Sequence, residues 1–356
     1  MGPTTLTTDP LDRMVLTAMT HQHEHRDAPE SPFLIERLLR EVRRQNQGTG
    51  FASEEDFRVA LQSLLDEGLE DRRLTTLQND PVELAQELAY QAYESETGDE
   101  ALAHCQEALR LDPGCVDALT ITALMTSEDA GALIDALEHA ADCAEQTLGQ
   151  DYFEQSDGSF WSLVAARPYL RTLKQLAEVL WSVGRRFDAV DTYELLLDLD
   201  PEDHAGHATL LLSCYLSMGE VQRSWDLLEE LDDDESALYR WAWVLIDLMS
   251  TNTEAARESL DRAIEANPHV ISYLLGLEEA EPELAPYVKA GSEAEARVCA
   301  QILADAWDRN PDALMWLERT LADLGLIEAP DDDLGPDYDD DLDYIDSLDD
   351  RPETKH

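Results

Sequence analysis

Three helical stretches that end at Pro113, Pro201 and Pro268 follow one template, and this repeat constrains the fold more than any other feature of the chain. A small alanine lies twelve residues before each proline, a larger side chain follows four positions later, and alanine or leucine comes three positions after that. The template residues are Ala101, Cys105 and Ala108, then Ala189, Tyr193 and Leu196, then Ala256, Leu260 and Ala263. Because small residues let neighbouring helices approach closely and proline ends a helix, the template predicts a regular stack of helices.

The spacing of the template indicates a unit of constant length. Pro201 and Pro268 are 67 residues apart, about two units of roughly 34 residues. Gly184 and Gly219 are 35 residues apart, so a further unit without a closing proline lies between those two prolines. Residues 82–270 resemble the tetratricopeptide repeat family, whose unit is a helix–turn–helix of 34 residues. The resemblance implies an all-α, right-handed solenoid of helix pairs, with a concave groove that binds a peptide.

The match to the tetratricopeptide family is best in the unit that ends at Pro201, where Gly184 stands at the turn. The first-helix packing positions of that unit are Leu173, Leu176, Ala177 and Leu180. The chain departs from the family pattern because it lacks the usual first-helix tryptophan and because Phe187 falls one place later than expected. Leu231 also replaces a small residue in the next unit.

A narrower resemblance covers residues 150–320. The segments RPYLRTLKQLAEVLWSVGRR, NPHVISYLLG and AWDRNPDALMWL are similar to prokaryotic relatives of the suppressor-of-tumorigenicity-7-like family. This resemblance implies the same repeat scaffold and supplies no established chemistry.

Composition and periodicity divide the chain into four parts. Residues 1–80 form a leader and a small helical region, in which residues 33–47 are expected to be an amphipathic helix. Residues 81–276 form the repeat array, and residues 277–327 form helices that cap it. Residues 328–356 are expected to be a disordered acidic tail, because they have few apolar residues and many like charges.

The charge of the chain is strongly negative, with 78 acidic against 25 basic residues and a net charge of −53. Residues 328–350 contain twelve acidic residues and no lysine or arginine, so most of the negative charge lies elsewhere. A surface adapted to concentrated salt and an acidic protein from a low-salt source both remain open. Either explanation argues against binding to nucleic acid or to an anionic membrane.

The five cysteines are scattered without metal-ligand spacing, and no apolar run is long enough for a signal peptide or a membrane span. These features predict a cytoplasmic protein with reduced, mostly buried thiols. The histidines of HQHEH, residues 21–25, could hold a metal if the segment were extended, but a polar leader is the simpler interpretation. No motif for a nucleophile or a nucleotide is present, so neither catalysis nor a cofactor is predicted.

Arg167, Arg171 and Lys174 follow i, i+4, i+7 spacing, which aligns three cations on one helix of a base-poor chain. The family resemblance places Arg171 and Lys174 in the groove, together with Glu178 and Trp181. The groove positions of other units are Tyr90, Tyr93 and Trp241. These eight residues are the predicted peptide-binding site. Local ion pairs are the alternative for the cations, and core packing is the alternative for the aromatics.

The sequence therefore predicts a non-catalytic scaffold or adaptor whose groove binds a peptide or protein. The alternatives are a regulatory subunit of an enzyme complex and a metal-dependent enzyme that uses clustered carboxylates. A further hypothesis is an intramolecular contact, in which apolar and acidic residues of 334–348 occupy the groove beside Arg167, Arg171, Lys174 and Trp181. The alternative is a solvated tail that contacts nothing. The arginines of residues 37–44 are a rival docking face for this tail.

Overall fold

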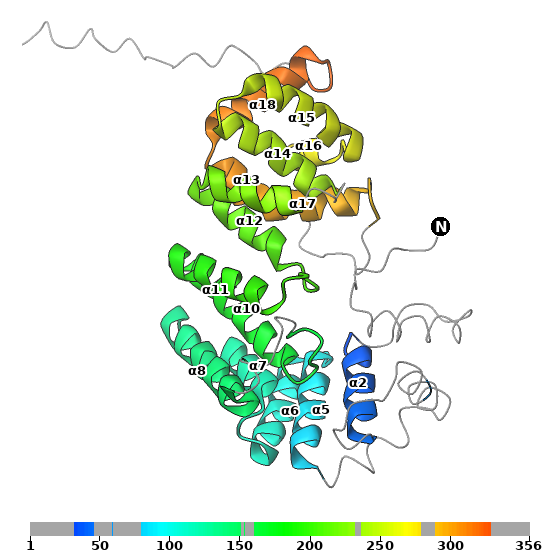
Figure 1. The fold of residues 1–356 in the computed structure, drawn as a ribbon, viewed down its shortest axis with the longest axis vertical. Helices are drawn as coiled ribbons and strands as arrows, with labels where there is room; N and C mark the ends of the chain where they lie inside the picture. The colour runs from blue at the N-terminus through cyan, green and yellow to red at the C-terminus, as the bar shows by residue number, and fades with distance from the viewer. Residues whose placement is uncertain are drawn as a thin grey trace, which may run out of the picture.

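The computed structural model describes residues 32–45, 59, 80–150, 153, 160–231, 236–278 and 289–328 (Figure 1). Within these ranges all regular structure is helical and no strand occurs, which confirms the predicted all-α class. The long helices are α2 (Leu34–Gln45), α5 (Pro81–Tyr93), α6 (Gly98–Leu111), α7 (Val116–Thr126), α8 (Ala130–Leu148), α10 (Arg167–Ser182), α11 (Arg186–Leu199), α12 (His207–Met218), α13 (Val221–Glu230), α14 (Ala237–Met249), α15 (Thr253–Ala266), α17 (Glu293–Asp308) and α18 (Pro311–Asp323). One short helix, α16 (Val270–Leu274), follows α15.

The repeat template has a structural counterpart in the packing of α6, α11 and α15. All nine template residues are buried, and none is more than 6% exposed. The small residues Ala189 and Ala256 are completely inaccessible, as expected where one helix approaches another closely. The predicted helix register is therefore confirmed at these positions.

The residue before each template proline ends its helix in the same way. Asp112, Asp200 and Asn267 have φ between −160° and −137°, well outside the helical range. Proline disfavours the helical conformation for the residue that precedes it, which accounts for this backbone. In each case the N–H of the capping residue still donates to the carbonyl oxygen four positions earlier. A local signal thus sets the boundary of three units.

Glycines make the turns inside two units, as predicted. Gly184 after α10 has φ of 83°, and Gly219 after α12 has φ of 78°. Residues with a Cβ rarely adopt this left-handed conformation, so glycine is favoured at both turns.

Helices pack against their immediate and next-but-one neighbours along most of the array. Helix α5 contacts α6 and α7, α7 contacts α8 and α10, and α12 contacts α13 and α14. Helices α7 and α8 form a further pair, between the units that end at Pro113 and Pro201. Helices α5, α7 and α10 follow one another in space (Figure 1), and the carboxylate of Asp117 on α7 accepts hydrogen bonds from Gln86 of α5 and Arg171 of α10.

Helix α17 lies in the segment 277–327, which the sequence assigns to helices that cap the array. It begins at a side-chain cap, where the N–H of Glu295 donates to Ser292 Oγ over 3.2 Å. However, α17 lies against α12 and α14 and does not simply extend the stack (Figure 1). The hydroxyl of Ser213 on α12 donates to the carbonyl oxygen of Ile302 over 2.5 Å. Burial of apolar side chains holds α17 in this position, because Leu303 and Trp307 are buried in one core cluster with residues of α12 and α14.

Several sequence predictions fall outside the described residues. These are most of the leader and small helical region of residues 1–80, of which only 32–45, 59 and 80 are described, the histidines of residues 21–25 and the tail after Glu328.

Candidate functional site

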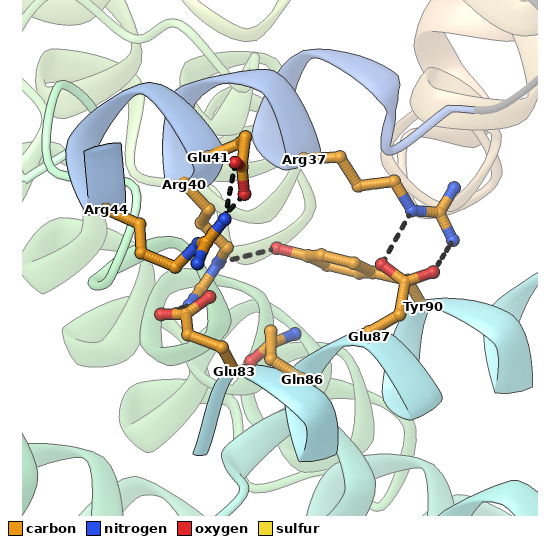
Figure 2. A pocket seen from close by; sticks show the side chains of 8 residues that line it. All are labelled: Arg37, Arg40, Glu41, Arg44, Glu83, Gln86, Glu87 and Tyr90. Carbon is orange, nitrogen blue, oxygen red and sulfur yellow. Dashed lines mark hydrogen bonds and ion pairs between the residues drawn. The ribbon is translucent and has the colours of Figure 1, made fainter. Parts of the chain in front are cut away.

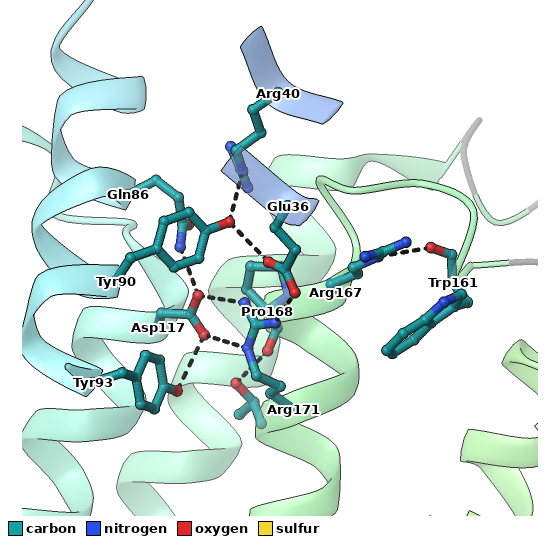
Figure 3. Close-up of polar contacts among 11 residues, drawn as sticks. Glu36, Arg40, Gln86, Tyr90, Tyr93, Asp117, Trp161, Arg167, Pro168 and Arg171 are labelled. Carbon is teal, nitrogen blue, oxygen red and sulfur yellow. Dashed lines mark hydrogen bonds and ion pairs between the residues drawn. The ribbon is translucent and has the colours of Figure 1, made fainter. Parts of the chain in front are cut away.

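Helix α2 presents a polar edge to the array (Figure 3). Glu36, Arg37 and Arg40 form this edge, because residues four positions apart lie on the same side of a helix. Leu38 and Val42, elsewhere on the helix, are almost completely buried. The array residues that contact the edge are Glu83, Glu87, Tyr90 and Glu94 of α5 and its C-terminal cap, together with Arg171 of α10. We call the surface that they form with Gln86, Tyr93 and Asp117 the α5/α7/α10 face.

Asp117 is the centre of this face. Its carboxylate is completely inaccessible and accepts two hydrogen bonds from Arg171, of 3.0 and 2.6 Å. It also accepts from Gln86 Nε2 over 2.6 Å and from the Tyr93 hydroxyl over 3.3 Å. A buried carboxylate is tolerated only with such partners, and here four donors surround it.

Arg171 links α10 to α2 as well as to α7. Its Nη1 donates to Glu36 Oε1 over 2.6 Å. Burial disfavours the charged guanidinium, but the carboxylates of Asp117 and Glu36 outweigh this effect and raise the pKa of Arg171 well above its usual range. The guanidinium therefore stays charged while it joins three helices.

Tyr90 connects the acidic and basic residues of α2. Its hydroxyl donates to Glu36 Oε2 over 2.8 Å and accepts from Arg40 Nε over 3.0 Å. Burial raises the pKa of Tyr90 well above its ordinary value, so the hydroxyl keeps its proton at neutral pH.

An aromatic contact accompanies these polar ones at the start of α2. The ring of Phe33 stacks on Tyr90 and Tyr93, at centroid distances of 4.8 and 5.0 Å. The Arg171 guanidinium lies 5.4 Å from the Phe33 centroid, within the range of a cation–π contact. Phe33 thus occupies an aromatic and cationic recess on the face.

Besides the contacts of Tyr90 with Glu36 and Arg40, Arg37 also joins α2 to α5 (Figure 2). The guanidinium donates to both carboxylate oxygens of Glu94, over 2.6 and 2.8 Å, and to Glu87 over 3.2 Å. Arg40 adds an ion pair of 3.2 Å to Glu83. A cavity of only about 20 Å³ remains between α2 and α5, which is room for about one water molecule.

Three of the predicted site residues come together on this face. Tyr90, Tyr93 and Arg171 lie on two different units, and all three contact α2 or the carboxylate beneath it. In this structure the helix α2 of the chain itself occupies the positions that the sequence assigns to a peptide.

The other cations of the predicted stripe do not converge with Arg171. Arg167 lies 4.5 Å from the Trp161 ring centroid and donates to the Trp161 carbonyl oxygen over 3.0 Å. Lys174 pairs with Glu178 over 2.8 Å, one turn along the same helix. The cations that the tail hypothesis places in an open groove are thus engaged in local contacts.

The remaining two aromatics have different environments. Trp181 is half-buried, and Arg186 lies 4.9 Å from its ring centroid. Trp241 is completely inaccessible and donates its indole N–H to the Asn267 carbonyl oxygen over 3.2 Å. Trp241 therefore packs in the core, which was the alternative to ligand contact.

The sequence reasoning did not select Glu36, Asp117 or Phe33. Asp117 stands between the apolar residues Val116 and Ala118, and a carboxylate in such a position is a signal of a buried ion pair. Glu36 and Phe33 carry no comparable signal, because their partners come from distant units.

Four of the five cysteines are buried thiols, as predicted. Burial raises the pKa of Cys115 and of Cys214 to about 12, which is the reverse of what a nucleophile requires. No cluster of three or more metal-ligating side chains occurs in the described part of the chain. Within that part, no helix is long and apolar enough to cross a membrane. No protein-family model matches the sequence, and the search of characterised proteins gave no match either.

Proposed function

We propose that this protein is a non-catalytic scaffold of tetratricopeptide type, which binds an α-helical segment of a partner protein on the α5/α7/α10 face. The observation that carries the proposal is the position of α2, which covers this face with Phe33, Glu36 and Arg37. The face supplies aromatic rings for an apolar anchor and acidic side chains for arginine, in one arrangement.

Most contacts between α2 and the α5/α7/α10 face are polar, and this supports reversible binding. Ion pairs and hydrogen bonds between α2 and the face are satisfied in the folded chain, yet water and ions can satisfy the same groups when the helix leaves. A partner helix with an aromatic residue followed by glutamate and arginine would make equivalent contacts. We infer that α2 is the intramolecular occupant that such a helix displaces.

The proposal is tested with the full-length chain and a fluorescent peptide of residues 32–45. Wild-type protein should bind the peptide weakly, because its own α2 holds the face. Arg37→Glu places like charges against Glu87 and Glu94, so peptide affinity measured by anisotropy should rise about tenfold or more.

Two variants make the result specific. Arg37→Glu combined with Arg171→Ala should lose the gain, because the peptide then lacks its partner for Glu36. Arg43→Glu changes the charge equally at an exposed position of α2 and should behave as wild type. Equal affinity in all four proteins would contradict helix binding by this face. Proteins that Arg37→Glu captures from source cells, and the double variant does not, are candidate partners.

A further inference from the structure

Helices α13, α14 and α15 line a second recess, of about 230 Å³, which is remote in sequence from the residues of α2. Its lining residues are Trp225, Arg240, Trp243, Asp247, Ala255, Glu258, Ser259 and Arg262. The volume is more than ten times that of the cavity beside α2 and can hold one large side chain.

Two tryptophans form the apolar part of the recess. Trp225 of α13 and Trp243 of α14 meet edge to face, with centroids 4.9 Å apart and an interplanar angle of 86°. Trp225 is 36% exposed. An exposed indole beside a hollow offers apolar area to a flat side chain, and tryptophan is enriched at sites where one protein segment anchors on another.

Two arginines supply positive charge around the tryptophans. Among the residues that the structure describes, no acidic side chain pairs with the Arg240 guanidinium. Arg262 has one exposed pair with Glu258, at 3.7 Å, and such pairs contribute little. The carboxylate of Asp247 is 5% exposed and already accepts from Ser259 Oγ over 2.6 Å. The recess therefore fits a segment with a large aromatic side chain and neighbouring carboxylates.

We propose that residues 337–346 of this chain, DYDDDLDYID, dock in this recess. Tyr338 or Tyr344 would insert beside Trp225 and Trp243, and the flanking aspartates would face Arg240 and Arg262. The sequence of this segment matches the recess: it alternates tyrosine or leucine with aspartate and contains no lysine or arginine. In a chain with only 25 basic residues, two arginines beside two tryptophans make a specific complement to it.

The helix that precedes the tail contacts one of the helices that line the recess. Helix α18 packs against α14, the helix that carries Arg240 and Trp243. Ten residues separate Glu328, where the described chain ends, from Tyr338, and an extended chain of that length spans about 33 Å. A tethered segment has an effective concentration near the millimolar range, so a weak contact suffices for occupancy.

Photocrosslinking in the full-length protein tests the proposal. Benzoylphenylalanine replaces Tyr338 in one protein and Tyr344 in another, and crosslinked peptides are identified by mass spectrometry after irradiation. We expect at least one of them to crosslink within its own chain to residues 221–262. Crosslinks to α5, α7 or α10 would overturn the site, crosslinks only between two chains would overturn the intramolecular occupant, and an absence of crosslinks would overturn both.

Charge-reversal variants then establish which residues recognise the tail. Arg240→Glu should lower the crosslink yield about tenfold, because it repels the aspartates. Arg257→Glu is the matched control, since Arg257 is exposed on α15 and does not line the recess. Circular dichroism confirms that both variants are folded. Equal yields from the two variants would contradict recognition through Arg240. These results are independent of peptide binding to the α5/α7/α10 face.

Discussion

The guanidinium of Arg171 is paired with the carboxylate of Asp117 through two hydrogen bonds, although 54 residues separate them in the sequence. Asp117 belongs to α7 and Arg171 to α10, so the pair joins two consecutive units. Because Glu36 of α2 and Gln86 of α5 contact the same pair, four helices meet at one polar centre. The stability of this centre and the position of α2 are therefore linked.

Asp117→Ala should destabilise the protein by about 3 kcal/mol, because it leaves the partly buried Arg171 charge with one fewer carboxylate. Gln86 and Tyr93 lose an acceptor at the same time. Equilibrium unfolding in urea measures the change.

A double-mutant cycle separates the pair from its surroundings. Asp117→Ala with Arg171→Met removes both charges and should cost less than the sum of the two single variants. Additive effects would mean that the pair contributes no coupling energy and that the centre is held by other contacts.

Ala189→Phe should overpack the crossing of α11 with its neighbours and cost about 1–3 kcal/mol. Ala189 is completely inaccessible and lies in one cluster with Leu137 and Leu180. Ala132→Phe, at an exposed position of α8, is the control and should change the melting temperature little. If the two variants have the same melting temperature, the template alanine does not mark the helix crossing.

Asp203 should give the protein a measurable pH dependence. Burial raises its pKa to about 6, from 3.8, although it accepts from the N–H groups of His207 and Ala208 over 2.6 and 3.0 Å. The folded state therefore binds this proton more tightly than the unfolded chain does. The stabilisation that results is complete below pH 3.8 and is lost as the pH rises through 6.

Asp203→Asn removes this titration and suits the local backbone, because Asp203 has φ of 48°, which asparagine tolerates. The free energy of unfolding of this variant, relative to wild type, should rise by about 2 kcal/mol between about pH 4 and pH 7. Burial lowers the pKa of His207 to about 4, an effect of opposite sign that is present in both proteins. Asp191→Asn, at an exposed position of α11, is the matched substitution control.

Added salt should raise the melting temperature if the acidic surface is an adaptation to concentrated salt. The net charge of −53 is self-repulsive, and salt screens exposed charges more than buried pairs such as Arg37 with Glu87. A series in KCl from about 0.1 to 2 M measures the trend. A flat or falling melting temperature would favour an acidic protein from a low-salt source.

The repeat could be predicted because its signals are local. Ala189 and Ala256 mark helix crossings, and Pro113 and Pro201 fix helix ends through the residue before them. Each of these signals depends on residues within one turn or one pair of neighbouring helices. A short stretch of sequence is therefore enough to predict the helix crossing or the helix end.

The site could be predicted only in part. The family resemblance assigns Tyr90 and Arg171 to groove positions of two different units, so the sequence predicted that they share one surface. The occupant of that surface could not be inferred, because Arg37 and Arg40 look like any basic side of an amphipathic helix until α5 lies beside them. The contacts of α17 could not be inferred for a similar reason: Leu303 is buried in one cluster with residues of α12 and α14, which lie far from it in the sequence.

The shared helix ends at Asp112, Asp200 and Asn267 have a consequence for how such a chain can change. Each unit boundary is specified by residues next to it and not by contacts with distant units. Duplication or deletion of a whole unit would therefore leave the register of its neighbours intact. Such a change is constrained where Arg171 contacts Glu36 and where α17 lies against α12, because these contacts join parts of the chain that are far apart in the sequence.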